Sequence, residues 1–127
     1  MMAKILLVDD DESIRITLAV LLEEDGFAVD VADSCATALA CAANDAASYD
    51  LVLLDAHLRD GLGTSILPLL RARQPAARVI LITGGVSDSD YVCPGLDAVL
   101  SKGIACADLL ARVHAELEEA TRRRSCA

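Results

Sequence analysis

Residues 4–11 read KILLVDDD, a short aliphatic run that ends directly in three carboxylates. Four similar runs follow, and the longer stretches between them carry apolar residues at helical spacing. The five runs cover residues 5–8, 28–31, 51–54, 79–82 and 98–100. Strands that are aliphatic almost throughout and alternate with helices are typical of a parallel sheet covered on both faces. The sequence therefore predicts an α/β fold with a doubly wound sheet of five parallel strands.

The stretches between the runs also indicate where helices begin and end. Gly26 is placed to end the first helix, and Asp33 or Ser34 to cap an alanine-rich second helix that ends near Asn44. A third helix fits residues 64–73. The residues expected on the buried faces of the first and last helices are Ile14, Leu18, Leu21, Leu22, Leu109, Leu110, Val113 and Leu117.

The segment before the last strand leaves little room for a helix. Gly84 and Gly85 open it, and Pro94 and Gly95 close it. Residues 87–93 between them amount to about two turns at 3.6 residues per turn. We expect this fourth helix to be short, irregular or mobile.

The composition indicates a single globular domain and argues against a nucleic-acid-binding protein. A chain of 127 residues with 54% hydrophobic residues predicts one domain with a substantial core. The net charge of −9 and the low aromatic content, two Tyr, one Phe and no Trp, argue against direct binding of nucleic acid. We place a single domain over residues 1–121 and a basic C-terminal tail over residues 122–127, with the three arginines suited to a helix C-terminus.

The cysteines and the apolar runs indicate the compartment. The five cysteines contain no C-x-x-C pair and have no matching histidine cluster, which argues against disulfides and against a zinc site. None of the apolar runs approaches the roughly 18 residues of a membrane span. We therefore expect a cytoplasmic protein with free thiols that does not insert into a membrane.

Polar residues follow four of the five predicted strands at the point where each strand ends. Asp9 and Asp10 follow the first, Asp55 the third, Thr83 ends the fourth, and Lys102 comes just after the fifth. Ligands of open α/β sheets bind outside the carboxyl ends of the strands. The sequence therefore predicts a site where these side chains meet.

Each of these residues also suits an ordinary structural role. Asp11 and Glu12 suit the start of the first helix, where acidic groups are favoured. Asp55 can be a turn residue, Thr83 a cap and Lys102 a surface lysine. Because all of them fall on one edge of the sheet, we favour a functional site for the set.

The donor set suggests phosphoryl chemistry. Oxygen ligands on one edge suit Mg²⁺, which binds through one or two carboxylates and a phosphate. A free aspartate can attack phosphorus to form an aspartyl phosphate. An ammonium and a hydroxyl would stabilise the charge on the transferred group. Asp10, Asp55, Lys102 and Thr83 supply that set.

Four fragments, in order along the chain, resemble the receiver domain of bacterial two-component response regulators. The fragments are residues 4–11 (KILLVDDD), residues 53–63 (LLDAHLRDGLG), Thr83-Gly84 and Ser101-Lys102. The resemblance covers essentially the whole chain and implies the flavodoxin-like strand order 2-1-3-4-5, with helices on both faces.

The resemblance also implies residue roles. Asp55 would accept a phosphoryl group from a phosphohistidine on a sensor histidine kinase or a histidine phosphotransfer protein. Asp9 and Asp10 would organise the Mg²⁺ site, with Asp10, Asp55 and the backbone carbonyl of His57 as direct ligands. Such a domain is no enzyme in the ordinary sense, because it catalyses only its own phosphorylation and dephosphorylation.

By the same resemblance, Lys102 and Thr83 would hold phosphoryl oxygens, and Thr83 would move to report them. The side chain of His57 can either reach the phosphoryl group or lie in solvent, and we favour the second. The output would be a downstream protein target or an effector domain outside this chain. The sequence leaves open whether the chain is a single-domain regulator or part of a longer one.

Three positions depart from the family pattern. Gly103 follows Lys102 where a proline is usual, and Arg59 stands where a proline is common. Val99 occupies the place of a Tyr or Phe that couples phosphorylation to the surface in many receivers. The predicted chemical site is therefore complete, while the usual route of transmission is altered.

Two other functions use some of the same residues. Asp9-x-Asp11, Thr83 and Lys102 are similar to the motifs of haloacid-dehalogenase phosphatases, but that reading leaves Asp55 unexplained. A pseudo-receiver, which binds a protein partner without being phosphorylated, would be favoured by the loss of Asp10, Asp55 or Lys102. All three are present.

Overall fold

A computed structural model describes residues 2–44, 48–84 and 94–126. Its main sheet has five parallel strands in the order β2-β1-β3-β6-β7. The strands are β1 (Lys4–Val8), β2 (Ala28–Ala32), β3 (Leu51–Asp55), β6 (Arg78–Thr83) and β7 (Ala98–Ser101). When only these five strands are counted along the chain, their order in the sheet is 2-1-3-4-5. This confirms the predicted fold and strand order.

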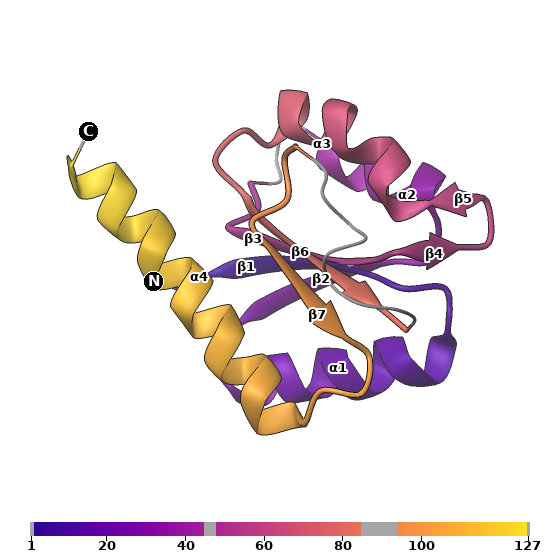
Figure 1. The fold of residues 1–127 in the computed structure, drawn as a ribbon, viewed down its shortest axis with the longest axis horizontal. Helices are drawn as coiled ribbons and strands as arrows, with labels where there is room; N and C mark the ends of the chain where they lie inside the picture. Colours follow the sequence, from indigo (N-terminus) through magenta and orange to yellow (C-terminus); the bar gives the residue numbers. More distant parts are fainter. Residues whose placement is uncertain (1, 45–47, 85–93, 127) are drawn as a thin grey trace.

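Helices cover both faces of the sheet (Figure 1). They are α1 (Glu12–Glu24), α2 (Cys35–Ala42), α3 (Leu67–Arg73) and α4 (Cys106–Cys126). α1 and α4 lie on one face, and α2 and α3 on the other. The predicted fourth helix over residues 87–93 falls outside the described residues.

Alternation along the strands divides the core in two. Leu6 and Leu54 face α2 and α3, whereas Leu7 and Leu53 face α1 and α4, and all four are buried. Side chains alternate between faces in a strand, so a run that is aliphatic at every position fills both layers. This is the physical basis of the continuous apolar runs in the sequence.

The first two helices begin as their sequences predict. Asp11 caps α1 by accepting a hydrogen bond from the Ile14 N–H at 3.2 Å. Ser34 caps α2 in a capping box with Thr37. The roles predicted for Asp11 and Ser34 are confirmed.

The third helix differs from the prediction over residues 64–73. Residues Gly63–Ile66 form a 3₁₀ turn, and the α-helix begins only at Leu67. Pro68 explains the late start, because proline lacks an N–H and is accepted only in the first turn of an α-helix.

A small antiparallel hairpin was not predicted. Its strands are β4 (His57–Leu58) and β5 (Gly61–Leu62), directly after β3. Its strands are too short to show a periodic pattern in the sequence.

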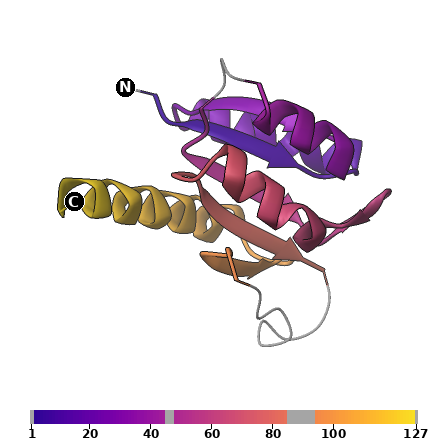
Figure 2. The same ribbon diagram turned by 90° about the horizontal axis from the view of Figure 1, so that it is seen from above.

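The last helix is long and extends beyond the sheet at its C-terminal end (Figures 1 and 2). It continues to Cys126, so the segment predicted as a tail from residue 122 has a helical backbone as far as that residue. Among the described residues, no helix combines the length and the apolar character needed to span a membrane.

Candidate functional site

The carboxyl ends of β1, β3, β6 and β7 bring the predicted side chains to one edge of the sheet, here called the carboxyl edge. Asp9 and Asp10 follow β1, Asp55 is the last residue of β3, and Lys102 follows β7. Carboxylate oxygens of Asp9, Asp10 and Asp55 lie within 4.8 Å of one another. We call these three residues the acidic cluster.

Two of the three aspartates are buried. Asp9 is 3% exposed and Asp55 is 2% exposed, while Asp10 is exposed to solvent. Asp9 Oδ1 accepts a hydrogen bond from the Asp11 N–H at 2.9 Å, and Asp55 Oδ1 accepts one from the His57 N–H at 3.2 Å. Backbone amides thus fix the orientation of both buried carboxylates within the cluster.

Electrostatics disfavours full ionisation of this cluster. Burial raises the pKa of Asp9, and the nearby negative charges of Asp55 and Asp10 raise it further. The Asp11 N–H and the charge of Lys102 lower the pKa of Asp9, but the net shift is upward. A bound cation would remove this repulsion, and three carboxylates in such proximity are a donor set that suits Mg²⁺.

Lys102 supplies a positive charge beside the cluster. Its Nζ lies 3.2 Å from Asp55 Oδ2, and its side chain is 34% exposed. Burial alone would lower the pKa of Lys102, but its hydrogen bond to Asp55 and the charges of Asp55, Asp9 and Asp10 outweigh burial and raise that pKa. The side chain is therefore an ammonium ion at neutral pH.

Backbone contacts fix the position of Lys102. Its N–H donates to the Thr83 carbonyl at 2.9 Å, which joins the residue after β7 to the end of β6. A Cβ at Gly84 would come within 3.3 Å of Lys102 Cδ, so a glycine there leaves space for the lysine side chain. Thr83 itself is fully buried at the end of β6.

Gly63 supports the site through a close backbone approach. A Cβ at this position would lie 2.1 Å from the Asp55 carbonyl oxygen, where no atom fits. The Gly63 N–H donates to the Ala56 carbonyl at 2.8 Å. The sequence shows a glycine here, but only the structure shows why it must lack a side chain.

The three departures from the family pattern have distinct structural contexts. The Gly103 N–H, which a proline would lack, donates to Ser101 Oγ at 3.2 Å. Arg59 pairs with Asp33 at 3.0 Å. Val99 is partly buried and packs against the core on the α2 and α3 side.

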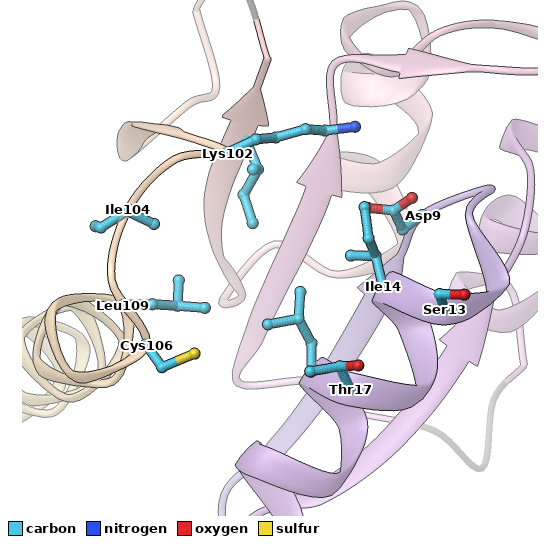
Figure 3. Close-up of a pocket in the computed structure, with 10 residues that line it drawn as sticks. Asp9, Ser13, Ile14, Thr17, Lys102, Ile104, Cys106 and Leu109 are labelled. Atoms are coloured by element: carbon cyan, nitrogen blue, oxygen red, sulfur yellow. The ribbon is translucent and has the colours of Figure 1, made fainter.

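A pocket of about 290 Å³ opens beside the acidic cluster, between α1 and the start of α4. Figure 3 shows Ile14 and Thr17 on one side of this pocket and Cys106 and Leu109 on the other. Asp9 and Lys102 also line it. The charged site is therefore continuous with a largely apolar depression.

Known proteins share this sequence pattern. The sequence model of the response regulator receiver domain matches residues 5–114. The sensory transduction protein RegX3 of Mycobacterium tuberculosis is 37% identical over 119 residues, covering 91% of this chain and 51% of RegX3. The photosynthetic apparatus regulatory protein RegA of Rhodobacter capsulatus is 36% identical over 80 residues, covering 63% of this chain and 42% of RegA. The chain thus spans about half the length, or less, of these curated relatives.

Solved structures agree with the sequence comparison. A CheY-like receiver domain from Methanospirillum hungatei superposes with a TM-score of 0.89 at 30% identity, covering 97% of this chain and 99% of that one. A response regulator from Burkholderia pseudomallei, solved with a phosphorylated aspartic acid, a calcium ion and citrate, gives 0.80 at 29% identity, covering 98% and 74%. With the strand order and the family match, these likenesses establish that the chain belongs to the response regulator receiver domain family of two-component systems.

Proposed function

We propose that this chain accepts a phosphoryl group on Asp55 in a Mg²⁺-dependent phosphorelay. The donor is a phosphohistidine on a sensor histidine kinase or a histidine phosphotransfer protein. One observation carries the proposal: Asp55 is a buried carboxylate that belongs to the acidic cluster and lies 3.2 Å from the Lys102 ammonium. Phosphorylation of an aspartate is the general function of the family.

The acidic cluster fits the metal that receiver domains generally bind. Asp10 and Asp55 would hold Mg²⁺ directly, together with the backbone carbonyl of His57, and Asp9 would organise the site. Bound Mg²⁺ neutralises carboxylate charge and attracts phosphoryl oxygens. All of these donors are hard oxygen atoms, which is the ligand type that Mg²⁺ prefers.

The transfer itself requires a nucleophile and stabilised charge. A carboxylate oxygen of Asp55 forms a bond to phosphorus while the P–N bond of the phosphohistidine breaks. The electron pair of the P–N bond stays on the imidazole nitrogen, and the ring takes up one proton from the solvent so that neutral imidazole leaves. Lys102 and the Thr83 hydroxyl bind phosphoryl oxygens, where negative charge accumulates in the transition state.

This activity makes the chain a signalling phosphoacceptor that catalyses only its own phosphorylation and dephosphorylation. Receiver domains act between histidine kinases and effectors. The partner downstream is a protein target or an effector domain outside this chain, and the cytoplasm is the compartment where such kinases present their phosphohistidines.

Intact-mass spectrometry tests the proposal. The native chain, incubated with phosphoramidate and Mg²⁺, is expected to gain one phosphoryl group, and Asp55→Asn is expected to gain none. Asp108→Asn is a matched control, because this exposed aspartate in the first turn of α4 lies outside the acidic cluster. An unmodified native chain would overturn the proposal in favour of a pseudo-receiver.

A further inference from the structure

Asp60 makes a contact that its place in a turn does not require. Its Oδ1 accepts a hydrogen bond from the Cys35 N–H at 2.8 Å, and its Oδ2 accepts one from the Ala36 N–H at 3.1 Å. Cys35 and Ala36 are the first two residues of α2. One carboxylate from the β4–β5 hairpin therefore binds the start of a helix 24 residues earlier in the chain. We call this pair of hydrogen bonds the Asp60–α2 contact.

The contact adds to a cap that is already complete. Ser34 caps α2 through the Thr37 N–H, so Asp60 pairs with two other amides of the first turn, which have no partner inside the helix. A carboxylate at a helix N-terminus is favoured by both the amides and the helix dipole. These two N–H groups lower the pKa of Asp60, so the carboxylate remains charged at neutral pH.

Two weaker contacts hold the same hairpin against α2. Arg59 pairs with Asp33 at 3.0 Å, just before the helix. The Cys35 thiol lies 3.7 Å from the Leu62 carbonyl oxygen, within reach of a weak hydrogen bond. The hairpin is thus bound to α2 by residues on both sides of its turn.

The hairpin also carries part of the proposed metal site. It begins two residues after Asp55, and His57 in β4 is the residue whose carbonyl is assigned to Mg²⁺. His57 pairs with Leu62, and Leu58 pairs with Gly61. Because this ladder is so short, the position of the His57 carbonyl depends on what holds the turn at Asp60-Gly61.

We propose that Asp60 is a positioning residue of the Mg²⁺ site. By binding the start of α2 it fixes the β4–β5 hairpin, and with it the His57 carbonyl, in the orientation that the metal requires. This inference rests on the proposed function, since it assumes that the acidic cluster binds Mg²⁺. Outer groups that orient metal ligands typically change metal affinity about 10- to 100-fold when they are removed.

The test measures the Mg²⁺ dissociation constant by titration calorimetry, without any phosphoryl donor. Asp60→Ala is expected to weaken binding about tenfold, the low end of that range, because one ligand of the site is affected. Asp60→Asn retains one acceptor oxygen and is expected to fall between the native chain and Asp60→Ala. Amide hydrogen exchange over residues 57–62, measured without metal, is expected to be faster in Asp60→Ala than in the native chain.

Ser34→Ala is the matched control for helix stability. It removes the cap of α2 while leaving the Asp60 carboxylate and its two amide partners in place. We expect it to lower the unfolding temperature yet change the Mg²⁺ dissociation constant less than twofold. A fall in affinity equal to that of Asp60→Ala would show that Asp60 acts only through stability, and would overturn the inference.

The remaining outcomes separate this inference from the proposed function. If Asp60→Ala does not fold, Asp60→Asn carries the comparison. Native affinity in both Asp60 variants would overturn the positioning role while leaving the proposed function intact. If the native chain binds Mg²⁺ but gains no phosphoryl group, the proposed function fails and the affinity comparison still decides the role of Asp60. If the native chain does not bind Mg²⁺, both fail.

Discussion

Charged side chains gather near both ends of β6, and the two groups differ in the ratio of negative to positive charges. At the carboxyl edge, the three carboxylates of the acidic cluster face one ammonium, that of Lys102. At the opposite end, Arg78 pairs with Glu116 at 2.6 Å and with Asp97 at 3.2 Å, and Arg71 pairs with Asp97 at 2.6 Å. Among these buried and partly buried groups, two guanidiniums match two carboxylates, and the half-exposed Arg112 pairs with Glu116 from the periphery at 3.5 Å. We call this second group the balanced network.

The difference in balance separates a structural role from a binding role. Arg78 and Glu116 are buried, with side chains 9% exposed, and their charges satisfy one another. The balanced network joins β6 to α4 and needs no further ion. The acidic cluster carries an excess of negative charge on partly buried carboxylates. This excess is unfavourable unless a cation binds to the cluster.

Breaking the balanced network is expected to have the largest effect. Arg78→Ala leaves the buried Glu116 and the partly buried Asp97 without one of their partners, and we expect a loss of about 3–5 kcal/mol in unfolding free energy. Urea denaturation measures it. Arg112→Ala is the control, because its 3.5 Å pair with Glu116 is partly exposed and is worth about 0.5 kcal/mol. Equal losses in the two variants would contradict a structural role for the buried pair.

A change at the carboxyl edge is expected to have an intermediate effect. Gly63→Ala places a Cβ against the Asp55 carbonyl oxygen and forces the backbone apart. We expect a loss of about 2 kcal/mol in urea denaturation and slower phosphorylation by phosphoramidate. Gly103→Ala is the matched control, since its Cβ would meet only Ser101 Oγ at 3.7 Å. Native phosphorylation kinetics in Gly63→Ala would show that the close approach at Asp55 does not matter for the site.

The smallest effect concerns the charge of Asp9. Its pKa is raised in the folded chain above the ordinary 3.8. The stability that Asp9 contributes is therefore present below pH 3.8 and is lost as the pH rises through the raised value. In the presence of a chelator, Asp9→Asn is expected to remove this loss and so to raise the unfolding free energy at neutral pH.

The prediction for Asp9 is checked by measuring the unfolding free energy of the native chain and of Asp9→Asn over a range of pH and comparing the two. Addition of Mg²⁺ is expected to stabilise the native chain more than Asp9→Asn, which reverses the order at neutral pH. A variant that is less stable than the native chain at neutral pH without metal would contradict the repulsion inferred for the acidic cluster.

The same two ends of β6 show how far the sequence could predict this structure. Asp9, Asp10, Asp55, Thr83 and Lys102 were predictable because parallel strands end at one edge, so a polar residue after an aliphatic run has a known place. Ser34 and Asp11 were predictable as caps because capping acts over three residues.

The balanced network and Asp60 could not be predicted in the same way. Arg78 and Glu116 are 38 residues apart, and nothing local distinguishes Glu116 from the other acidic residues of α4. Asp60 has the local signal of a turn, yet its partners belong to α2. Contacts between distant elements depend on how helices dock, which no short window of sequence contains.

The central claim is that the acidic cluster at the carboxyl edge of the sheet accepts a phosphoryl group on Asp55. The most direct measurement is to trap the product with sodium borohydride, which reduces an acyl phosphate to an alcohol, and to locate the resulting homoserine by peptide mass spectrometry. The account predicts homoserine at position 55 alone, and only when Mg²⁺ is present. Homoserine at position 9, which a phosphatase-like mechanism requires, or at no position, would contradict it.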